Sequence, residues 1–241
     1  GDFANLSKRV QNDNFDLFCI NLNQPGSVHH SLHLTIPSEV IKKGEQKFFF
    51  EDKNIPYDNL SVNEIVLFKQ QIANRPTTKK SKIIVSFACL GKTYYASKHP
   101  EKSVDIESLP YRFHSDIVTE ATKANTSLMH NSSFPKNYVE EIVNNLGSYE
   151  YIFVVLSVPA LKMLDDIGLE YTILYPDATM IDVIIDRAKR RGNNDTMIDL
   201  LYRNLSSSTE LELMKSVLKC KNYIFVKDNE YIQDLVERGD I

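Results

Sequence analysis

The most informative stretch of the chain is Ser81-Lys82-Ile83-Ile84-Val85-Ser86-Phe87-Ala88-Cys89-Leu90-Gly91-Lys92-Thr93. A short apolar run ends at Val85, a brief loop follows, and Gly91-Lys92-Thr93 opens a helical pattern. This order of strand, loop and helix is the context that a phosphate-binding loop requires. In such a loop, backbone N–H groups and the positive end of the helix hold phosphate oxygens. The lysine adds a positive charge, and the threonine hydroxyl can bind Mg²⁺.

The match to the phosphate-loop pattern G-x-x-x-x-G-K-[ST] is partial, because Ser86 stands where the pattern has its first glycine. A Cβ in the loop restricts positive φ and hinders the close approach of a phosphate to the backbone. An ordinary strand–turn–helix corner is therefore the alternative to a nucleotide site. The predicted nucleotide-binding residues are Ser86, Ala88, Cys89, Leu90, Gly91, Lys92, Thr93 and Tyr94.

The composition is that of an ordinary soluble globular protein, with 241 residues, 42% hydrophobic and 25% charged. This length suits one large domain, or a small domain followed by a medium one. The formal net charge of -4 leaves no overall basic footprint for nucleic acid. No apolar run reaches membrane-spanning length, and the first residues lack the pattern of a signal peptide. Three widely spaced cysteines indicate a reducing compartment, so we expect a cytoplasmic protein.

Two domains are predicted, 1–76 and 77–241, because the pattern changes at the polar, proline-containing segment 75–81. The first domain has strand-like runs at 15–22, 28–36 and 48–50. Ser61 then begins a helix, and Glu64 completes a capping box. We predict a small β-rich (α+β) module of unknown role, which could bind a protein partner.

From Lys82 onward, strand-like and helix-like segments alternate, which predicts a mainly parallel sheet with helices on both faces. The strands are expected at 83–86, 102–106, 151–156, 169–175 and 222–227. Asp177 or Thr179 caps one later helix and Asp195 the next. In residues 108–136 no single period dominates, although 115–123 could be helical.

Ligands of an open parallel sheet bind at the carboxyl ends of the strands. The second strand ends at Asp105, with Glu107 and Ser108 close behind. A carboxylate there can hold a hydrated Mg²⁺ or orient a phosphate-accepting hydroxyl, and an exposed acidic turn is the alternative. The third strand ends at Ser157, where many phosphate-loop proteins place an aspartate.

Histidines give a weaker signal. His29, His30 and His33 cluster in one segment, but zinc would need further ligands. His33 with Thr35 also fits the His-x-Thr pattern of two-histidine phosphoesterases, whose second motif would have to come from His130 in loop-like sequence.

Several segments carry a family resemblance by their order. These are 82–96, 104–108, 134–138, 151–155, 171–176 and the basic run that leads into Gly-Asn, 187–194. Together they make residues 81–238 resemble small phage- and bacterium-encoded phosphate-loop proteins related to nucleoside monophosphate kinases. Members of that family usually have a Phe-Pro-Gly-Thr-Gly-Lys-Ser-like loop, where this chain has Ala88-Cys89-Leu90.

The resemblance implies a phosphate-loop kinase-like α/β fold that transfers the γ-phosphoryl group of ATP to a nucleotide or similar acceptor, with ATP and Mg²⁺ as cofactors. Lys92 would bridge the β and γ phosphates, Thr93 would bind Mg²⁺, and Asp105 would sit near the metal or the acceptor. The residues that would close from a lid are Arg187, Arg190 and Arg191. A phage-encoded member would act in the host cytoplasm.

The substituted loop leaves three hypotheses open. The first is an active nucleotide kinase, and the second is a degenerate, non-catalytic phosphate-loop protein that acts through protein contacts. The third is a nucleotide hydrolase or a polynucleotide-end kinase. The intact Gly91-Lys92-Thr93 favours the first and third, whereas Ser86, Leu90 and the missing acid after the third strand favour the second.

Overall fold

The computed structural model describes residues 15–18, 34–37, 59–75, 78–113, 131–220 and 222–241, which fall into two compact units. Within the first unit, β1 (Phe15–Phe18) pairs antiparallel with β2 (Leu34–Pro37), Phe15 opposite Pro37. Several predictions lie outside the described residues: the strand at 48–50, the helix at 115–123 and the roles of His29, His30, His33 and His130.

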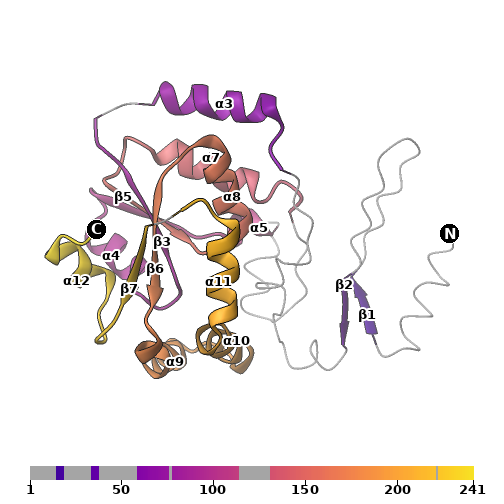
Figure 1. Cartoon of the computed structure of the whole chain (residues 1–241), viewed down its shortest axis with the longest axis vertical. Helices are drawn as coiled ribbons and strands as arrows, with labels where there is room; N and C mark the ends of the chain where they lie inside the picture. Colours follow the sequence, from indigo (N-terminus) through magenta and orange to yellow (C-terminus); the bar gives the residue numbers. More distant parts are fainter. Residues whose placement is uncertain (1–14, 19–33, 38–58, 76–77, 114–130, 221) are drawn as a thin grey trace. The chain divides into compact units, whose positions relative to one another are not determined.

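The second unit is built on a five-stranded parallel sheet in the order β4-β5-β3-β6-β7 (Figure 1). The strands are β3 (Lys82–Ser86), β4 (Ser103–Ile106), β5 (Tyr151–Val155), β6 (Tyr171–Pro176) and β7 (Tyr223–Val226). Central β3 pairs on both sides, with Val85 opposite Val154 and Ile173. Its apolar residues are buried, as a strand covered on both faces requires. The alternation of strands and helices confirms the predicted phosphate-loop kinase-like α/β fold.

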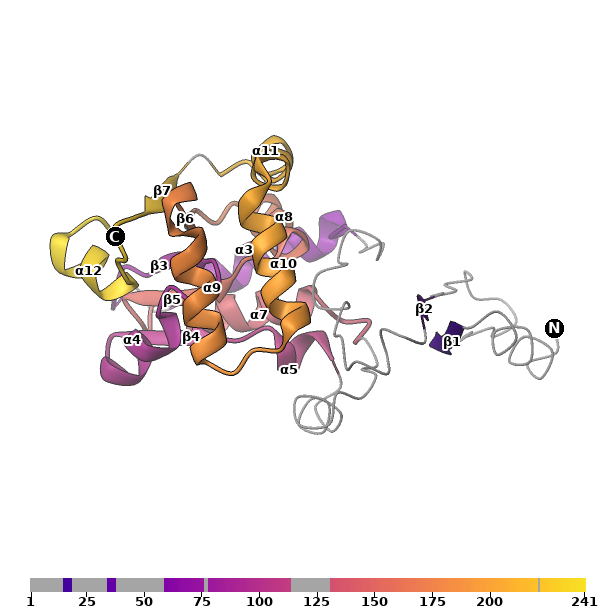
Figure 2. The same cartoon turned by 90° about the horizontal axis from the view of Figure 1, so that it is seen from below.

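Helices cover both faces of this sheet (Figures 1 and 2). On one side α4 (Lys92–Lys98) packs against α12 (Ile232–Arg238), and on the other α7 (Lys136–Asn145) packs against α8 (Val158–Ile167). A short helix, α5 (Leu109–Arg112), follows β4 and contacts α7.

The helix α3 (Val62–Ala73) confirms the predicted capping box. The Ser61 hydroxyl accepts a hydrogen bond from the Glu64 N–H at 3.3 Å, and the Ser61 N–H donates to Oε2 of Glu64 at 2.8 Å. The helix packs against α7 and α8, and Lys136 on α7 pairs with Glu64 at 2.7 Å. It therefore belongs to the second unit, and the domain division at residue 76 stays a prediction.

After β6 the chain forms four helical segments: η3 (Ala178–Met180), α9 (Ile181–Arg190), α10 (Asp195–Ser206) and α11 (Ser208–Val217). Asp177 caps η3 by accepting from the Thr179 N–H at 3.0 Å. The predicted cap at Asp195 is wrong by one residue, since Asn194 accepts from the Met197 N–H at 2.9 Å. Asn and Asp both cap helices well, so residue type alone does not choose between the two positions.

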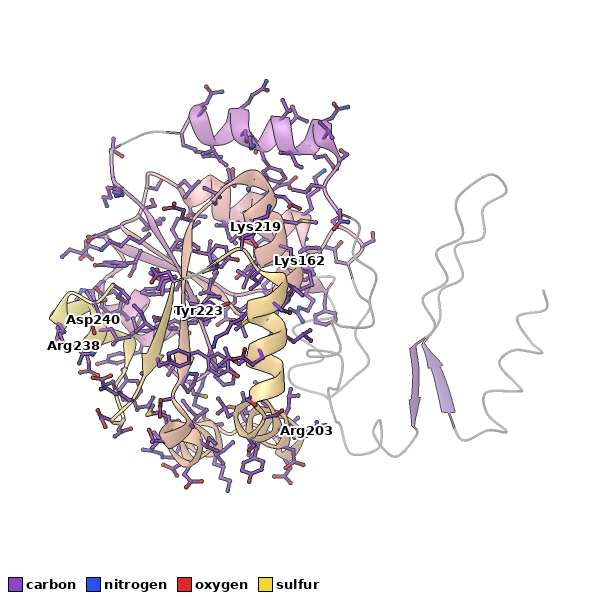
Figure 3. All side chains as sticks on the ribbon, in the orientation of Figure 1. Lys162, Arg203, Lys219, Tyr223, Arg238 and Asp240 are labelled. Atoms are coloured by element: carbon purple, nitrogen blue, oxygen red, sulfur yellow. The ribbon has the colours of Figure 1, made fainter. Side chains whose placement is uncertain are left out.

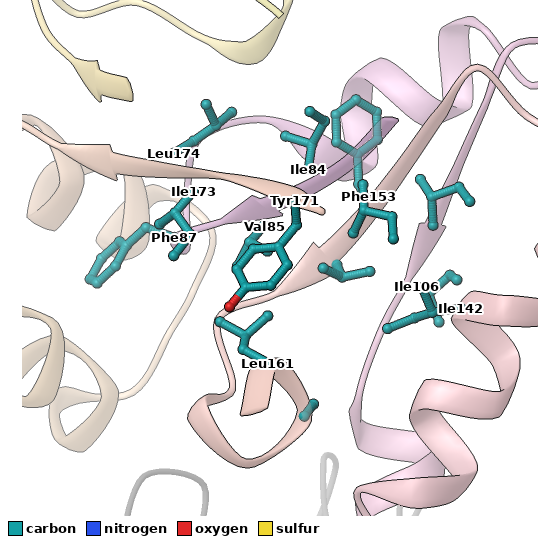
Figure 4. Close-up of a cluster of buried hydrophobic side chains, with 14 of the residues drawn as sticks. Ile84, Val85, Phe87, Ile106, Ile142, Phe153, Leu161, Tyr171, Ile173 and Leu174 are labelled. Carbon is teal, nitrogen blue, oxygen red and sulfur yellow. The ribbon is translucent and has the colours of Figure 1, made fainter. Parts of the chain in front are cut away.

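The core lies between the sheet and its helices, where Ile84, Phe153 and Ile173 are fully buried (Figure 4). Near the end of the chain, Arg238 pairs with Asp240 at 2.6 Å (Figure 3) and with Glu230 at 2.5 Å. The pair with Glu230 ties the end of α12 to the loop that precedes the helix. No helix in the described part of the chain is long and apolar enough to cross a bilayer.

Candidate phosphate-binding site

The loop between β3 and α4 contains two residues in the left-handed region, Cys89 (φ 64°) and Gly91 (φ 93°). A Cβ on Gly91 would lie 3.0 Å from Cδ1 of Tyr231, so this glycine is required both by its φ and by the space around it. Cys89 adopts positive φ although its Cβ disfavours this conformation. A left-handed residue on each side of Leu90 turns successive N–H groups to one side of the chain. This conformation favours anion binding.

The carbonyl groups of this loop are held by other parts of the protein. The Cys89 carbonyl accepts from Nη1 of Arg187 at 3.1 Å, and the Leu90 carbonyl accepts from the Ile232 N–H at 3.0 Å. By contrast, the backbone N–H groups from Gly91 to Tyr94 donate no backbone hydrogen bond to another described residue, whereas Ala88 and Cys89 form a hydrogen-bonded turn. The loop therefore offers donors rather than acceptors to a ligand.

Lys92, Thr93, Asp105 and Glu107 converge beside this loop. The ammonium Nζ of Lys92 lies 2.8 Å from Oδ1 and 3.2 Å from Oδ2 of Asp105, and it also pairs with Glu107. The Thr93 hydroxyl donates to Oδ2 of Asp105 at 2.6 Å. The Lys92 and Asp105 side chains are 11% and 7% exposed, so this pair is shielded from water.

The cluster fits a hydrated divalent cation. Mg²⁺ in proteins usually keeps several waters and binds one or two carboxylates together with substrate phosphates. Asp105 and the Thr93 hydroxyl supply such a donor set, although no group of three or more metal-ligating side chains occurs within the described ranges.

The three arginines that the resemblance assigns to a lid lie in different places. Arg187 is 5% exposed, and its Nη2 donates to the Asn229 carbonyl at 2.7 Å, to Asn229 Oδ1 at 2.8 Å and to the Glu230 carbonyl at 3.1 Å. Its guanidinium also stacks 3.6 Å from the ring centre of Tyr231. Burial lowers the pKa of Arg187. Arg187 therefore joins the phosphate loop to the turn between β7 and α12.

The other two arginines are more accessible. Arg190 is exposed and pairs with Asp186 at 2.5 Å on the same helix. Nη1 of Arg191 lies 3.8 Å from Sγ of Cys89, so this side chain reaches the loop. The structure thus brings Arg191, rather than Arg190, to the phosphate loop.

The remaining predicted residues of the loop differ in burial. The Ser86 hydroxyl is buried and donates to the Phe87 carbonyl at 2.9 Å. Leu90 is buried, Ala88 is half-buried, and Tyr94 exposes its ring beside Lys98, whose Nζ lies 5.7 Å from the ring centre.

Sequence reasoning missed the turn between β7 and α12, where Asp228 (φ 54°) and Asn229 (φ 61°) are both left-handed. A signal was present, because Asp and Asn tolerate this conformation and the turn follows the carboxyl end of the last strand.

Sequence reasoning also missed Tyr138, whose buried hydroxyl accepts from the Val155 N–H at 3.0 Å and donates to the Ile106 carbonyl at 2.6 Å. Burial raises the pKa of Tyr138 far above its ordinary value, so the hydroxyl keeps its proton. A tyrosine on the apolar face of a helix gives no such signal in a sequence.

Comparison with known proteins finds a similar solved structure but no matching family model or curated sequence. No family model matches the chain, and no curated protein matches its sequence. A solved structure that resembles it is a gluconokinase from Sinorhizobium meliloti 1021, with 18% identity and a TM-score of 0.36. The match covers 68% of this chain and 88% of the gluconokinase. A similarity at this level gives no information about the reaction of this chain.

Proposed function

We propose that this chain catalyses Mg²⁺- and ATP-dependent phosphoryl transfer to a nucleotide or a related small acceptor. The observation that carries the proposal is the convergence of Lys92, Thr93 and Asp105 at the start of α4, where the N–H groups from Gly91 to Tyr94 donate no backbone hydrogen bond to another described residue. Donors, a cation and a metal-binding carboxylate are the groups that position a nucleoside triphosphate.

Each group has a separate task in this proposal. The N–H groups of the loop and the Lys92 ammonium hold phosphate oxygens, and Thr93 with Asp105 would hold Mg²⁺. When bound, Mg²⁺ would offset the negative charge of the β and γ phosphates. Arg190 and Arg191 lie near the break between α9 and α10, from which they could close on the transferring group.

The charges of the cluster explain why a cation is needed. One ammonium, Lys92, lies between two carboxylates, Asp105 and Glu107, so the three groups together carry one negative charge. This charge repels a polyphosphate, whereas a bound divalent cation reverses its sign. We therefore expect nucleotide binding to depend strongly on Mg²⁺.

The finer parts of the proposal follow the family resemblance. A nucleoside monophosphate is the proposed acceptor, and a phage or bacterial origin and a cytoplasmic location belong to the same hypothesis. We also propose that the part of residues 1–76 that precedes α3 forms a separate module that binds a protein partner.

The first experiment is isothermal titration calorimetry with ATP, in the presence of Mg²⁺ and again with EDTA. We expect Mg²⁺-dependent binding that Lys92→Ala abolishes. The matched control is Lys98→Ala, which removes the same charge from the exposed end of the same helix. Lack of binding at millimolar nucleotide contradicts the proposal, and retention of binding in Lys92→Ala places the nucleotide elsewhere.

The second experiment distinguishes transfer from hydrolysis. With ATP labelled on its γ-phosphate, a panel of nucleoside monophosphates and of DNA and RNA 5′ ends is screened for the labelled product. Labelled nucleoside diphosphate supports a nucleotide kinase, and a labelled strand end supports a polynucleotide kinase. Release of inorganic phosphate without an acceptor supports a hydrolase, and binding without turnover supports a non-catalytic phosphate-loop protein.

A further inference from the structure

Tyr138 lies where two strands of the sheet end beside the candidate site. The residue is on α7, outside the phosphate loop, and its side chain is completely buried. Its hydroxyl links the backbone of two neighbouring strands, since it accepts from the Val155 N–H on β5 and donates to the Ile106 carbonyl on β4. Both contacts are at the carboxyl ends of the strands, where Ile106 pairs with Val154.

The hydrogen bond from Tyr138 to the Ile106 carbonyl acts next to two carboxylates of the candidate site. Ile106 stands between Asp105 and Glu107, and its carbonyl belongs to the peptide group that joins Ile106 to Glu107. Rotation of that peptide would redirect Glu107, which follows it, and would loosen the end of β4, the strand that carries Asp105. A hydrogen bond of 2.6 Å to the carbonyl restricts this rotation.

The surroundings of Tyr138 hold its ring in one place. The ring lies 5.5 Å from the ring centre of Tyr111 and 6.1 Å from that of Phe134. Neighbouring residues of α7, Val139 and Ile142, are also buried. These buried contacts hold the Tyr138 hydroxyl at the ends of the two strands.

We propose that Tyr138 is a positioning residue of the phosphate site: its hydroxyl fixes the carboxyl end of β4 against β5 and thereby directs Asp105 and Glu107 toward Lys92. This inference rests on the proposed function, because it assigns to Asp105 the binding of Mg²⁺ with the nucleotide. The hydroxyl is buried and both of its hydrogen bonds go to the backbone, so its loss should act through the carboxylates. Residues that orient a metal ligand in this indirect way typically change metal affinity by about 10- to 100-fold when they are replaced.

The test compares Tyr138→Phe with Tyr171→Phe. Tyr171 is also a buried tyrosine, and its hydroxyl donates to Oδ1 of Asp165 at 3.0 Å, but it begins β6 at the opposite end of the sheet. Both variants keep the ring and lose a buried hydroxyl. For each protein, ATP affinity is measured by calorimetry with Mg²⁺ and with EDTA, and the ratio of the two gives the enhancement by Mg²⁺.

We expect Tyr138→Phe to lower the enhancement by Mg²⁺ about tenfold or more, with a smaller change in affinity in EDTA. Tyr171→Phe should keep the wild-type enhancement even where it lowers the melting temperature. Equal enhancement in Tyr138→Phe and wild type overturns the positioning role. Failure of the proposed function is a different result, since the wild type itself would then bind no nucleotide, and the inference would fall with it.

If Tyr138→Phe does not fold at 25 °C, the same titrations are made at 10 °C in sucrose, which favours the compact state by exclusion from the protein surface. An enhancement that recovers fully to the wild-type value under these conditions would mean that the hydroxyl contributes to stability alone, which contradicts the proposal.

Discussion

Lys92 and Asp105 form a shielded ion pair across the carboxyl end of the sheet, with Nζ of Lys92 2.8 Å from Oδ1 of Asp105. The two residues come from different elements, the start of α4 and the end of β4. Strand β5 lies between β4 and β3, so the lysine must reach across it to meet the carboxylate. This pair joins the loop that offers phosphate-binding donors to the carboxylate that suits a cation.

Asp105→Asn should weaken ATP binding with Mg²⁺ and strengthen it in EDTA. The change removes a negative charge that repels the phosphates, and it also removes the carboxylate proposed to hold the cation. Calorimetry under both conditions measures the two effects. Asp182→Asn, at an exposed position in the first turn of α9, should leave both affinities unchanged. Equal loss of affinity with and without Mg²⁺ would contradict the role assigned to Asp105.

Arg187→Met should destabilise the fold by about 3 kcal/mol, because it leaves the Cys89 carbonyl and the acceptors of Asn229 without their charged donor. Arg190→Ala removes only an exposed pair within one helix and should cost less than about 0.5 kcal/mol. Urea unfolding monitored by circular dichroism gives both values. If the two variants are equally stable, Arg187 does not join the loop to the turn before α12.

Arg191→Ala should lower kcat more than it lowers ATP affinity, and it should do so to a greater extent than Arg190→Ala. The guanidinium of Arg191 already lies 3.8 Å from Sγ of Cys89 in the phosphate loop, whereas that of Arg190 pairs with Asp186. A positive charge that acts mainly on the transferring phosphoryl group affects the transition state more than the bound substrate. Steady-state kinetics on both single variants provides the comparison, and equal kcat values would exclude this role for Arg191.

Gly91→Ala should destabilise the fold more than Gly168→Ala does. Both glycines have similar φ, 93° and 80°, so each alanine is strained by about 1–3 kcal/mol. Only Gly91 has a close neighbour, because its added Cβ would lie 3.0 Å from Cδ1 of Tyr231, whereas nothing lies within 4 Å of a Cβ on Gly168. Thermal unfolding of both variants isolates the contact, and Gly91→Ala should cost less stability in a Tyr231→Ala background than in the wild type.

The stability of the wild type should fall between pH 4.5 and pH 2 more steeply than that of Glu64→Gln. Hydrogen bonds from Lys136 and Ser61 lower the pKa of Glu64 from 4.5 to about 2. A lowered pKa in the folded state means that the pairing stabilises the fold fully above pH 4.5 and is lost as Glu64 takes up its proton. Unfolding midpoints in urea across this range give the two curves, and parallel curves would show that the pair contributes nothing.

Much of the fold was predictable because its signals are local. The continuous apolar run at 151–156 predicts a strand covered on both faces, and the structure buries residues 151–154 of β5. The capping box of Ser61 and Glu64 was equally local. The cap at Asp195 was misplaced by one residue because Asn194 is an equally good cap, and residue type alone does not choose between them.

The candidate site was less predictable, because its contacts join distant parts of the chain. The rule on strand ends put Asp105 near Lys92, but it did not distinguish Arg187 from Arg191. Cations near the end of a helix look alike in a sequence whether they face water or a loop. Burial of Arg187 depends on where Asn229 and Tyr231 pack, about forty residues later in the chain.

The amino-acid sequence by itself determined the alternation of strands and helices, the position of the loop before α4 and the residue types at the strand ends. These follow from hydrophobic periodicity and turn chemistry, which act over a few residues. Only the tertiary structure decided that Arg187 and Ile232 hold the loop carbonyls, and that the Tyr138 hydroxyl joins β4 to β5. Such contacts depend on the packing of elements far apart in the chain, so no local pattern encodes them.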